Sequence, residues 1–307
     1  MSPSPHGKAE SIRQRIRNCL RERGEDMQFG LQRYARERFL YRLGCSPHRE
    51  RFVLKGAALF ALWGGTVYRP TRDLDFAGSG CSESAEVVAA FRHICDQGGD
   101  SEELRFDSDS IAAEPIRVDS EYQGLRLRFD AWLGKSRIPM LVDIGFADAV
   151  RPPPDPVEYP TLLEDPPPRI LAYPREAVIA KKRHAMVLLG DYNSRFKDFY
   201  DVYSLARQFE FQGARLAEAI AATFKRRRSE IGARIPVALT PEFYTQEDRD
   251  HQWNGYLKRS GLMEGSIDFE VVGGTILAFL CPIRATLASD EQFTGSWPPG
   301  GPWQISP

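Results

Sequence analysis

The residues best suited to chemistry are two carboxylates in the run Asp73-Leu74-Asp75-Phe76. Side chains two positions apart on an extended strand point to the same face, so the carboxylates share one face while Leu74 and Phe76 share the other. Two like charges held side by side repel each other unless a cation lies between them. The spacing therefore predicts a strand that binds a divalent metal ion, although an Asp-x-Asp pair alone is more often a solvated strand end.

A glycine turn, Lys55-Gly56-Ala57, lies upstream of the carboxylate pair and opens the apolar run 58–63. Free N–H groups at the start of a helix attract phosphate, so the three turn residues are predicted to contact a nucleotide. Arg69 and Arg72 flank the metal strand and are the best further candidates for phosphate contacts. A Lys-Gly turn alone is usually only a turn, but the turn and the carboxylate pair at this spacing together indicate nucleotide chemistry.

A third carboxylate, Asp143, interrupts the apolar segment Ile138–Phe146, which has the pattern of a strand. One explanation is an ion pair with a neighbouring arginine. The other is that Asp143 lies across the sheet from Asp73 and Asp75, so that three carboxylates bind two divalent ions. The residues alone leave both explanations open.

The segment Arg51–Phe76 resembles the first motif of the AbiEii/AbiGii family of toxins, also called MenT-like toxins. This family belongs to the nucleotidyltransferase superfamily that includes DNA polymerase beta, whose pattern is Gly-Ser or Gly-Gly, a helix and a carboxylate pair on a strand. Here Gly56-Ala57 replaces the usual pair, so a serine hydroxyl is lost while the backbone N–H groups remain. The run LVDIGFADAV also resembles the family, and this implies that Asp143 is the third metal ligand.

Two later segments, Ala180-Lys181-Lys182-Arg183 and Lys197-Asp198-Phe199-Tyr200-Asp201, resemble the family's A-E-K-L and (R/K)-D-x-x-D helices. The match implies that Lys182 is the catalytic lysine and Asp198 the last catalytic aspartate. Lys181 replaces the usual Glu and Arg183 the usual Leu, so the choice between Lys181 and Lys182 stays open. Without the resemblance, the acidic and basic residues of the second segment would be a surface network worth a few tenths of a kcal/mol.

The overall charge excludes wholesale electrostatic capture by nucleic acid, because the formal net charge of the 307 residues is -1. A polyanion must therefore meet a local basic patch. The most concentrated one is the run Lys225, Arg226, Arg227 and Arg228 at the end of an expected helix. This run either complements the carboxyl end of that helix or binds RNA phosphates.

Five cysteines without a C-x-x-C pair are typical of reduced thiols and not of a disulfide framework or a zinc site. The N-terminal residues show no apolar signal core. The most apolar stretch, Val271–Leu280, is shorter than the ~20 residues that span a bilayer. We therefore expect a cytoplasmic protein.

The order of elements predicts an α/β (α+β) fold. We expect N-terminal helices and a polymerase-beta-like nucleotidyltransferase core, a mixed sheet with flanking helices, over residues 1–150. Eight prolines predict a stiff extended connection over residues 151–173. A mainly helical domain that completes the active site is expected over residues 174–290, followed by a disordered tail over residues 291–307.

The resemblance implies a metal-dependent nucleotidyltransferase toxin of a bacterial toxin–antitoxin (abortive infection) system. Asp73, Asp75 and Asp143 would bind Mg²⁺ or Mn²⁺, and a nucleoside monophosphate would pass from an NTP to RNA, with the 3′ end of tRNA as the expected acceptor. Lys182 would stabilise triphosphate charge, and Asp198 would orient it or accept a proton. An antitoxin encoded nearby is the expected partner. The alternatives are transfer to a protein hydroxyl (NMPylation) and a non-catalytic nucleotide-binding module.

Overall fold

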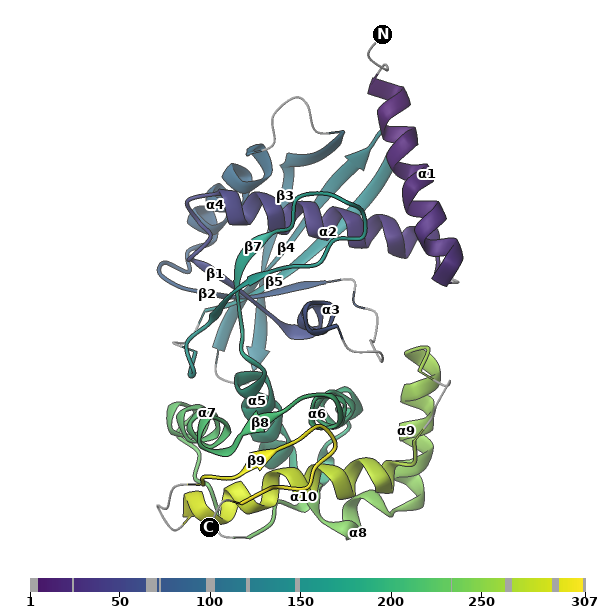
Figure 1. Cartoon of the computed structure of the whole chain (residues 1–307). Coiled ribbons are helices and arrows are strands. Elements are labelled where there is room, and N and C mark those ends of the chain that lie inside the picture. The colour runs from purple at the N-terminus through teal and green to yellow at the C-terminus, as the bar shows by residue number, and fades with distance from the viewer. Residues whose placement is uncertain are drawn as a thin grey trace. The chain divides into compact units, whose positions relative to one another are not determined.

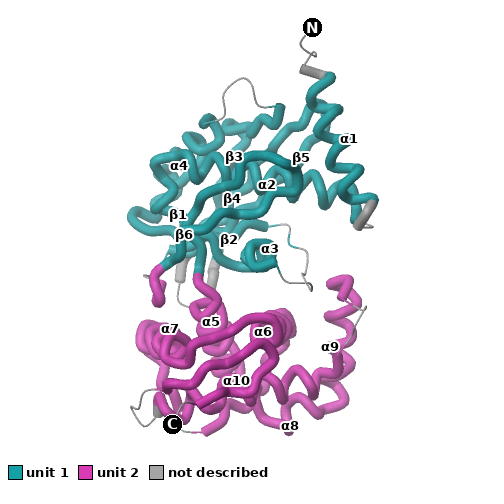
Figure 2. The backbone as a smooth tube through the Cα atoms, viewed as in Figure 1, with its two compact units in different colours: residues 1–64, 70–149, 154–173 teal, residues 65–69, 150–153, 174–307 magenta. Residues whose placement is uncertain are grey.

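The computed structural model of the chain describes residues 5–23, 25–64, 71, 73–97, 103–119, 122–146, 150–232, 234–262, 267–288 and 293–305. The chain divides into two compact units (Figure 2). Unit 1 comprises residues 1–64, 70–149 and 154–173, and unit 2 comprises residues 65–69, 150–153 and 174–307. Each unit is described by itself below.

Unit 1 is built on a seven-stranded mixed sheet in the order β3-β4-β5-β2-β1-β7-β6. Its strands are β1 (Phe52–Lys55), β2 (Leu74–Gly78), β3 (Leu104–Asp119), β4 (Tyr122–Leu133), β5 (Ser136–Phe146), β6 (Asp155–Glu158) and β7 (Arg169–Ala172). The β2–β5 and β1–β7 pairs are parallel, and the other pairs are antiparallel. Together with its flanking helices, this arrangement confirms the predicted fold class.

One face of the sheet is apolar because alternate residues of its strands are apolar. In β5 the buried side chains include Met140, Val142 and Ile144, while Asp143 between them is only half-buried. Figure 1 shows α2 (Met27–Cys45) lying across the strands. Its Phe39 stacks on Phe91 of α4 (Ser84–Asp96), at 5.5 Å between ring centroids, and α1 (Pro5–Arg23) packs on α2. The opposite, more polar face is therefore left for the charged residues.

Part of the proline-rich stretch over residues 151–173, which was predicted to be a stiff extended connection, pairs with the sheet. β6 pairs antiparallel with β7, and β7 pairs parallel with β1. Pro156 is tolerated because β6 is an edge strand, where a missing backbone N–H breaks no ladder on the outer side. Beyond β6, the Tyr159 hydroxyl donates to the carbonyl oxygen of Ala58 at 3.0 Å. Residues 154–173 therefore belong to the α/β unit.

Unit 2 is mainly helical. Its helices are α5 (Arg175–Leu189), α6 (Phe196–Gln208), α7 (Gly213–Arg226), α8 (Pro241–Tyr244), α9 (Glu247–Arg259) and α10 (Phe269–Ala288), and two short strands, β8 (Phe211–Gln212) and β9 (Ser296–Trp297), pair with each other. An aromatic cluster forms much of its core. Phe269 of α10 lies 5.3 Å from Phe199 of α6 and stacks on Trp253 of α9 at 5.2 Å, measured between ring centroids.

Helix α10 is long and apolar enough, by length and composition, to cross a membrane over Phe269–Leu287. Here Phe269, Val272, Ile276 and Phe279 are fully buried within unit 2, so this helix serves as the core helix of the unit. It runs through Pro282, and it is longer than the apolar stretch recognised in the sequence.

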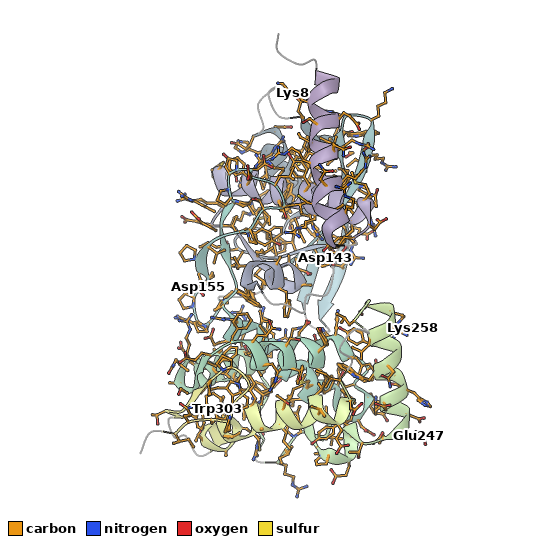
Figure 3. All side chains as sticks on the ribbon, turned by 45° about the vertical axis from the view of Figure 1, so that its right-hand side comes forward. Lys8, Asp143, Asp155, Glu247, Lys258 and Trp303 are labelled. Atoms are coloured by element: carbon orange, nitrogen blue, oxygen red, sulfur yellow. The ribbon has the colours of Figure 1, made fainter. Side chains whose placement is uncertain are left out.

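The C-terminal segment is ordered over residues 293–305, which corrects the predicted disordered tail. Trp297 is 2% exposed and donates its indole N–H to the carbonyl oxygen of Ala206 at 2.7 Å. Trp303 lies against α10 (Figure 3), stacks on Phe279 at 5.7 Å and donates to the carbonyl oxygen of the same residue at 2.9 Å. The packing of one buried and one half-buried indole stabilises this segment, despite the proline and glycine content that predicted disorder.

Candidate active site

The paired carboxylates lie on the central strand β2 in the arrangement that their spacing predicts. Leu74 and Phe76 are fully buried on one face, while Asp73, just before the strand, and Asp75 within it are half-buried on the other. β2 is bordered by β1 and β5. The carboxylates are therefore held by the middle of the sheet and not by a loop.

The glycine turn is in contact with the second carboxylate. In the antiparallel pair of β1 and β2, Lys55 is opposite Asp75, which places both on the same face. Gly56 follows with φ +73°, and a Cβ atom there would lie 2.1 Å from Oδ2 of Asp75. A side chain at position 56 would therefore be both strained and in collision with the carboxylate. The turn continues into the 3₁₀ segment Gly56–Ala58 and then α3 (Leu59–Trp63), and Ala57 is buried.

The third carboxylate lies on the same face. In the parallel pair of β2 and β5, Asp143 is the register partner of Asp75 (Figure 3 shows Asp143 among the strands of unit 1). It also faces Arg126 of β4, and the two side chains form a bidentate pair, with Nε–Oδ1 and Nη2–Oδ2 both at 2.7 Å. The contact that the structure shows is therefore the arginine ion pair, on the face that carries Asp73 and Asp75.

Arg126 interacts electrostatically with both Asp143 and Asp73 on this face. The hydrogen bonds from Arg126 to Asp143 raise the pKa of the arginine above its ordinary value, against the opposing effect of burial, and the charge of Asp73 adds to the increase. Arg126 is thus a permanent cation among the carboxylates.

Two of the three carboxylates on this face are suited to binding a divalent ion. Carboxylate oxygens on a rigid strand are the ligands that Mg²⁺ and Mn²⁺ prefer, and Asp73 and Asp75 provide them. Asp143 has both oxygens engaged by Arg126. In the part of the chain that the structure describes, no three acidic, histidine or cysteine side chains converge closely enough to hold a metal ion. Asp73 and Asp75 therefore fit such an ion, whereas Asp143 fits it only after exchanging the arginine for the metal.

The two flanking arginines, Arg69 and Arg72, lie outside the described residues. Their contacts with phosphate stay a prediction.

Unit 2 holds the second group of predicted residues, on α5 and α6. Asp198 and Asp201 are three residues apart and face α5, where Lys182 lies between them. The ammonium Nζ of Lys182 is 2.7 Å from Oδ1 of Asp198 and 2.6 Å from Oδ2 of Asp201. Both carboxylates are almost completely buried, at 2% and 1% exposure, while the lysine side chain is 16% exposed. Nε of Arg195 lies 2.8 Å from the other Asp198 oxygen, at a distance for an ion pair but without hydrogen-bond alignment.

The cluster is ionised at neutral pH. Burial alone would lower the pKa of Lys182, but the charges of Asp198 and Asp201 outweigh it, so the pKa lies above its ordinary value. Burial would likewise raise the pKa of Asp198, yet Lys182 and Arg195 reverse the effect and hold that pKa below its usual value. Lys182 is accordingly a fixed cation between two carboxylates.

Two residues of these clusters were missed by the sequence reasoning. Asp201 was recognised only as part of a surface ladder, although its three-residue spacing from Asp198 already places both on one helix face. Arg126 lies in a strand whose Leu125 and Leu127 alternate with it, which predicts its face but not the strand opposite. Only the register of β4 and β5 reveals that it meets Asp143.

The basic run at the end of α7 is mostly exposed. The side chains of Lys225, Arg226 and Arg228 are open to solvent, while Arg227 is half-buried, with Nη1 3.3 Å from Nδ1 of His184. A role of these residues in RNA binding stays a prediction.

A mixed sheet that carries a carboxylate pair beside a glycine turn is the core of a nucleotidyltransferase, and the sequence comparison agrees. Residues 38–273 match the family model described as nucleotidyl transferase AbiEii toxin, type IV toxin–antitoxin system. Because this match spans more than half of the chain, the protein belongs to the AbiEii family of nucleotidyltransferase toxins. Enzymes of this kind generally use a divalent metal and an NTP, and membership of a type IV system implies an antitoxin partner.

The structural comparison found two solved structures from Helicobacter pylori, both with TM-scores below 0.5. One is a candidate nucleotidyltransferase, with a TM-score of 0.48 and 15% identity, covering 87% of this chain and 100% of that one. The other is JHP933, with a TM-score of 0.49 and 14% identity, covering 87% of this chain and 95% of that one. None of the curated proteins compared with the chain is significantly similar to it in sequence.

Proposed function

We propose that this toxin transfers a nucleoside monophosphate from an NTP to RNA, with the 3′ end of tRNA as the acceptor and Mg²⁺ or Mn²⁺ as the metal. The observation that carries the proposal is the carboxylate face of the sheet. There Asp75 has Gly56 against it, Lys55 opposite on one side and Asp143 opposite on the other. Family membership supplies the reaction type, while the acceptor and the site residues are proposals.

On this face, Asp73 and Asp75 would hold the divalent ion, which would neutralise the triphosphate and lower the pKa of the attacking hydroxyl. The backbone N–H groups that follow Gly56 would bind phosphate oxygens, a role that needs no serine hydroxyl at Ala57. Arg69 and Arg72 are further proposed phosphate contacts. Arg126 keeps the Asp143 carboxylate oriented on the same face, ready to complete the ligand set.

Lys182 is proposed to stabilise the negative charge that develops on the triphosphate during transfer. Asp198 and Asp201 hold it ionised and in one position, so little reorganisation is needed when the charge develops. The direct contacts of Lys182 with both carboxylates favour it over Lys181 as the catalytic lysine. Asp198 acts here as a positioning residue.

RNA is proposed as the acceptor because of the exposed basic run Lys225, Arg226 and Arg228. With a net charge of -1, the chain can attract a polyanion only through a local basic patch of this kind. Phosphate contacts of this kind position a nucleic acid without reading its sequence. Both substrates, the NTP and tRNA, place the reaction in the cytoplasm.

The experiment that tests this function combines the purified protein with each α-labelled NTP, Mg²⁺, total tRNA and a cell extract. We expect label in tRNA with the wild type and none with Asp75→Ala. Label in protein would instead support nucleotide transfer to a protein hydroxyl. Nucleotide binding without any label transfer would support a non-catalytic module, and either result would overturn the proposal. Asp109→Asn, an exposed aspartate of β3, is the matched control that should retain transfer.

A further inference from the structure

Unit 2 encloses an arginine that has no acidic partner among the residues that the structure describes. Arg183 of α5 is 1% exposed. Its Nε and Nη1 atoms are buried and have no hydrogen-bond acceptor among the described residues. Its guanidinium carbon lies 5.0 Å from the centroid of the Phe224 ring on α7. A group with five N–H donors is thus packed against an aromatic face with at least two donor atoms unsatisfied.

This burial is costly for a charged group. Burial, followed by repulsion from Arg284 of α10, lowers the pKa of Arg183 to about 10, so the side chain stays protonated at neutral pH. A cation–π contact stabilises a desolvated cation by less than an unpaired buried charge costs. The aromatic ring alone therefore does not compensate the charge.

Further basic side chains lie near Arg183 and its neighbour His184. His184 follows Arg183 on α5, lies 5.0 Å from the same Phe224 ring and shares a 2.8 Å hydrogen bond between Nε2 and the Ser229 hydroxyl. Its other ring nitrogen is 3.3 Å from Nη1 of Arg227. Arg284 approaches from α10 closely enough to repel Arg183. Arg284 of α10 is thus a second cation near the buried guanidinium, while α7 contributes the Phe224 ring.

We propose that Arg183, with Arg284 near it, forms a binding site for a phosphate-type oxyanion in unit 2. We call these two residues the Arg183 site. A dianion with several acceptor oxygens matches the unsatisfied forked donors of a guanidinium. Because Arg183 is buried, the anion reaching it is a single phosphate group, either free or on an RNA chain.

The Arg183 site is separate from the Lys182 cluster, although the two residues are adjacent in sequence. Lys182 contacts Asp198 and Asp201 of α6, whereas Arg183 contacts Phe224 of α7. The AbiEii resemblance places a leucine at position 183, so the arginine distinguishes this chain from the family pattern. Binding at the Arg183 site does not depend on nucleotidyl transfer.

The test is thermal unfolding of the full chain in phosphate and in chloride at equal ionic strength and pH. The wild-type Tm should rise with the logarithm of the phosphate concentration, because only the folded chain binds the anion. Arg183→Leu should lose that dependence and remain folded, since replacing a buried charge by an apolar side chain is often neutral or stabilising. Arg259→Leu, the same change at an exposed arginine of α9, is the matched control and should keep the wild-type response.

The source of the phosphate is distinguished by a second titration with RNA oligonucleotides that carry or lack a 5′-phosphate. Tighter binding of the phosphorylated RNA that disappears in Arg183→Leu would assign an RNA phosphate. A response to inorganic phosphate alone would assign the free anion.

An unchanged wild-type Tm in phosphate, or a full response in Arg183→Leu, would overturn the site. If Arg183→Leu does not fold, Arg284→Gln takes its place. Asp75→Ala should respond as the wild type does, so loss of catalysis and loss of anion binding are distinguishable.

Discussion

At the scale of single residues, the glycine at position 56 decides whether the second carboxylate can occupy its place. A Cβ atom there would meet Oδ2 of Asp75 at 2.1 Å. Gly64 has a similar left-handed backbone, with φ +67°, but no atom of the described residues lies within 4 Å of such a Cβ. Both glycines therefore have a left-handed backbone that disfavours other residues, but only at Gly56 would a side chain collide with Asp75.

We predict that Gly56→Ala abolishes nucleotidyl transfer and that Gly64→Ala retains it. Both variants should lose about 1–3 kcal/mol of stability from the strained backbone, measured by urea unfolding, but only the first displaces the carboxylate. Equal activity of the two variants would show that Asp75 does not need its present position.

The Lys182 cluster gives a second prediction at this scale. Lys182→Met should cost about 3–5 kcal/mol of unfolding free energy, because it removes the cation that the buried carboxylates of Asp198 and Asp201 share. Chemical denaturation measures the change. Lys181→Met is the neighbouring control, and the cluster would have no such role if both variants lost equal stability.

The same cluster predicts a pH dependence. The pKa of Asp198 is lowered on folding, so its contribution is present above the unfolded value of about 3.9 and is lost as pH falls through the folded value. The pKa of Lys182 is raised, so its contribution is present below about 10.4 and is lost as pH rises through the folded value. The stability difference between wild type and Asp198→Asn, from urea unfolding at each pH, should be constant between these limits and shrink in acid. A difference that grows in acid would contradict the assignment.

At the scale of elements, local periodicity was enough to place the carboxylates and not enough to find their partners. The alternation in β2 and β5 predicts which side chains share a face, because the side-chain period of a strand is two. The pairing of Arg126 with Asp143 depends on the register between β4 and β5, which involves residues distant in sequence. Asp143 therefore had two open explanations, and only the sheet shows which contact is made.

Two segments have more structure than their amino-acid composition predicted. The prolines of residues 151–173 predicted only a stiff extended connection, but residues 155–158 form an edge strand that accommodates Pro156. The proline and glycine content of residues 291–307 predicted disorder, but Trp297 and Trp303 pack on the helical unit. Amino-acid composition does not predict the structure of either segment, because a few specific contacts decide whether a segment is ordered.

The ordered C-terminal segment yields a prediction. Trp297→Ala should destabilise the protein by about 3–5 kcal/mol, since it removes a side chain that is 2% exposed and packed 4.9 Å from the Phe279 ring. Ile305→Ala, at a side chain that is 66% exposed, should change stability by less than about 0.5 kcal/mol. Thermal unfolding compares the two, and a segment without structure would give two equally small effects.

At the scale of the whole molecule, the mixed sheet and the AbiEii match define a nucleotidyltransferase toxin. Its charges are almost balanced, with 41 lysines and arginines against 42 acidic residues, so its specific contacts depend on where the charges lie. One group lies on the polar face of the sheet and another between α5 and α6. We propose that the first group binds the metal, while the second holds the fixed cation Lys182.

The most direct test of this account is the rate of pyrophosphate release from an NTP in the presence of tRNA and Mg²⁺. The account predicts a rate that disappears on chelation of the metal and falls at least about 100-fold in Asp73→Asn and in Asp75→Asn, since loss of supporting residues around a metal already costs 10–100-fold. The rate should be unchanged in Asp109→Asn. Pyrophosphate release that persists in chelator, or in both β2 variants, would contradict the assignment of this carboxylate pair as the catalytic centre.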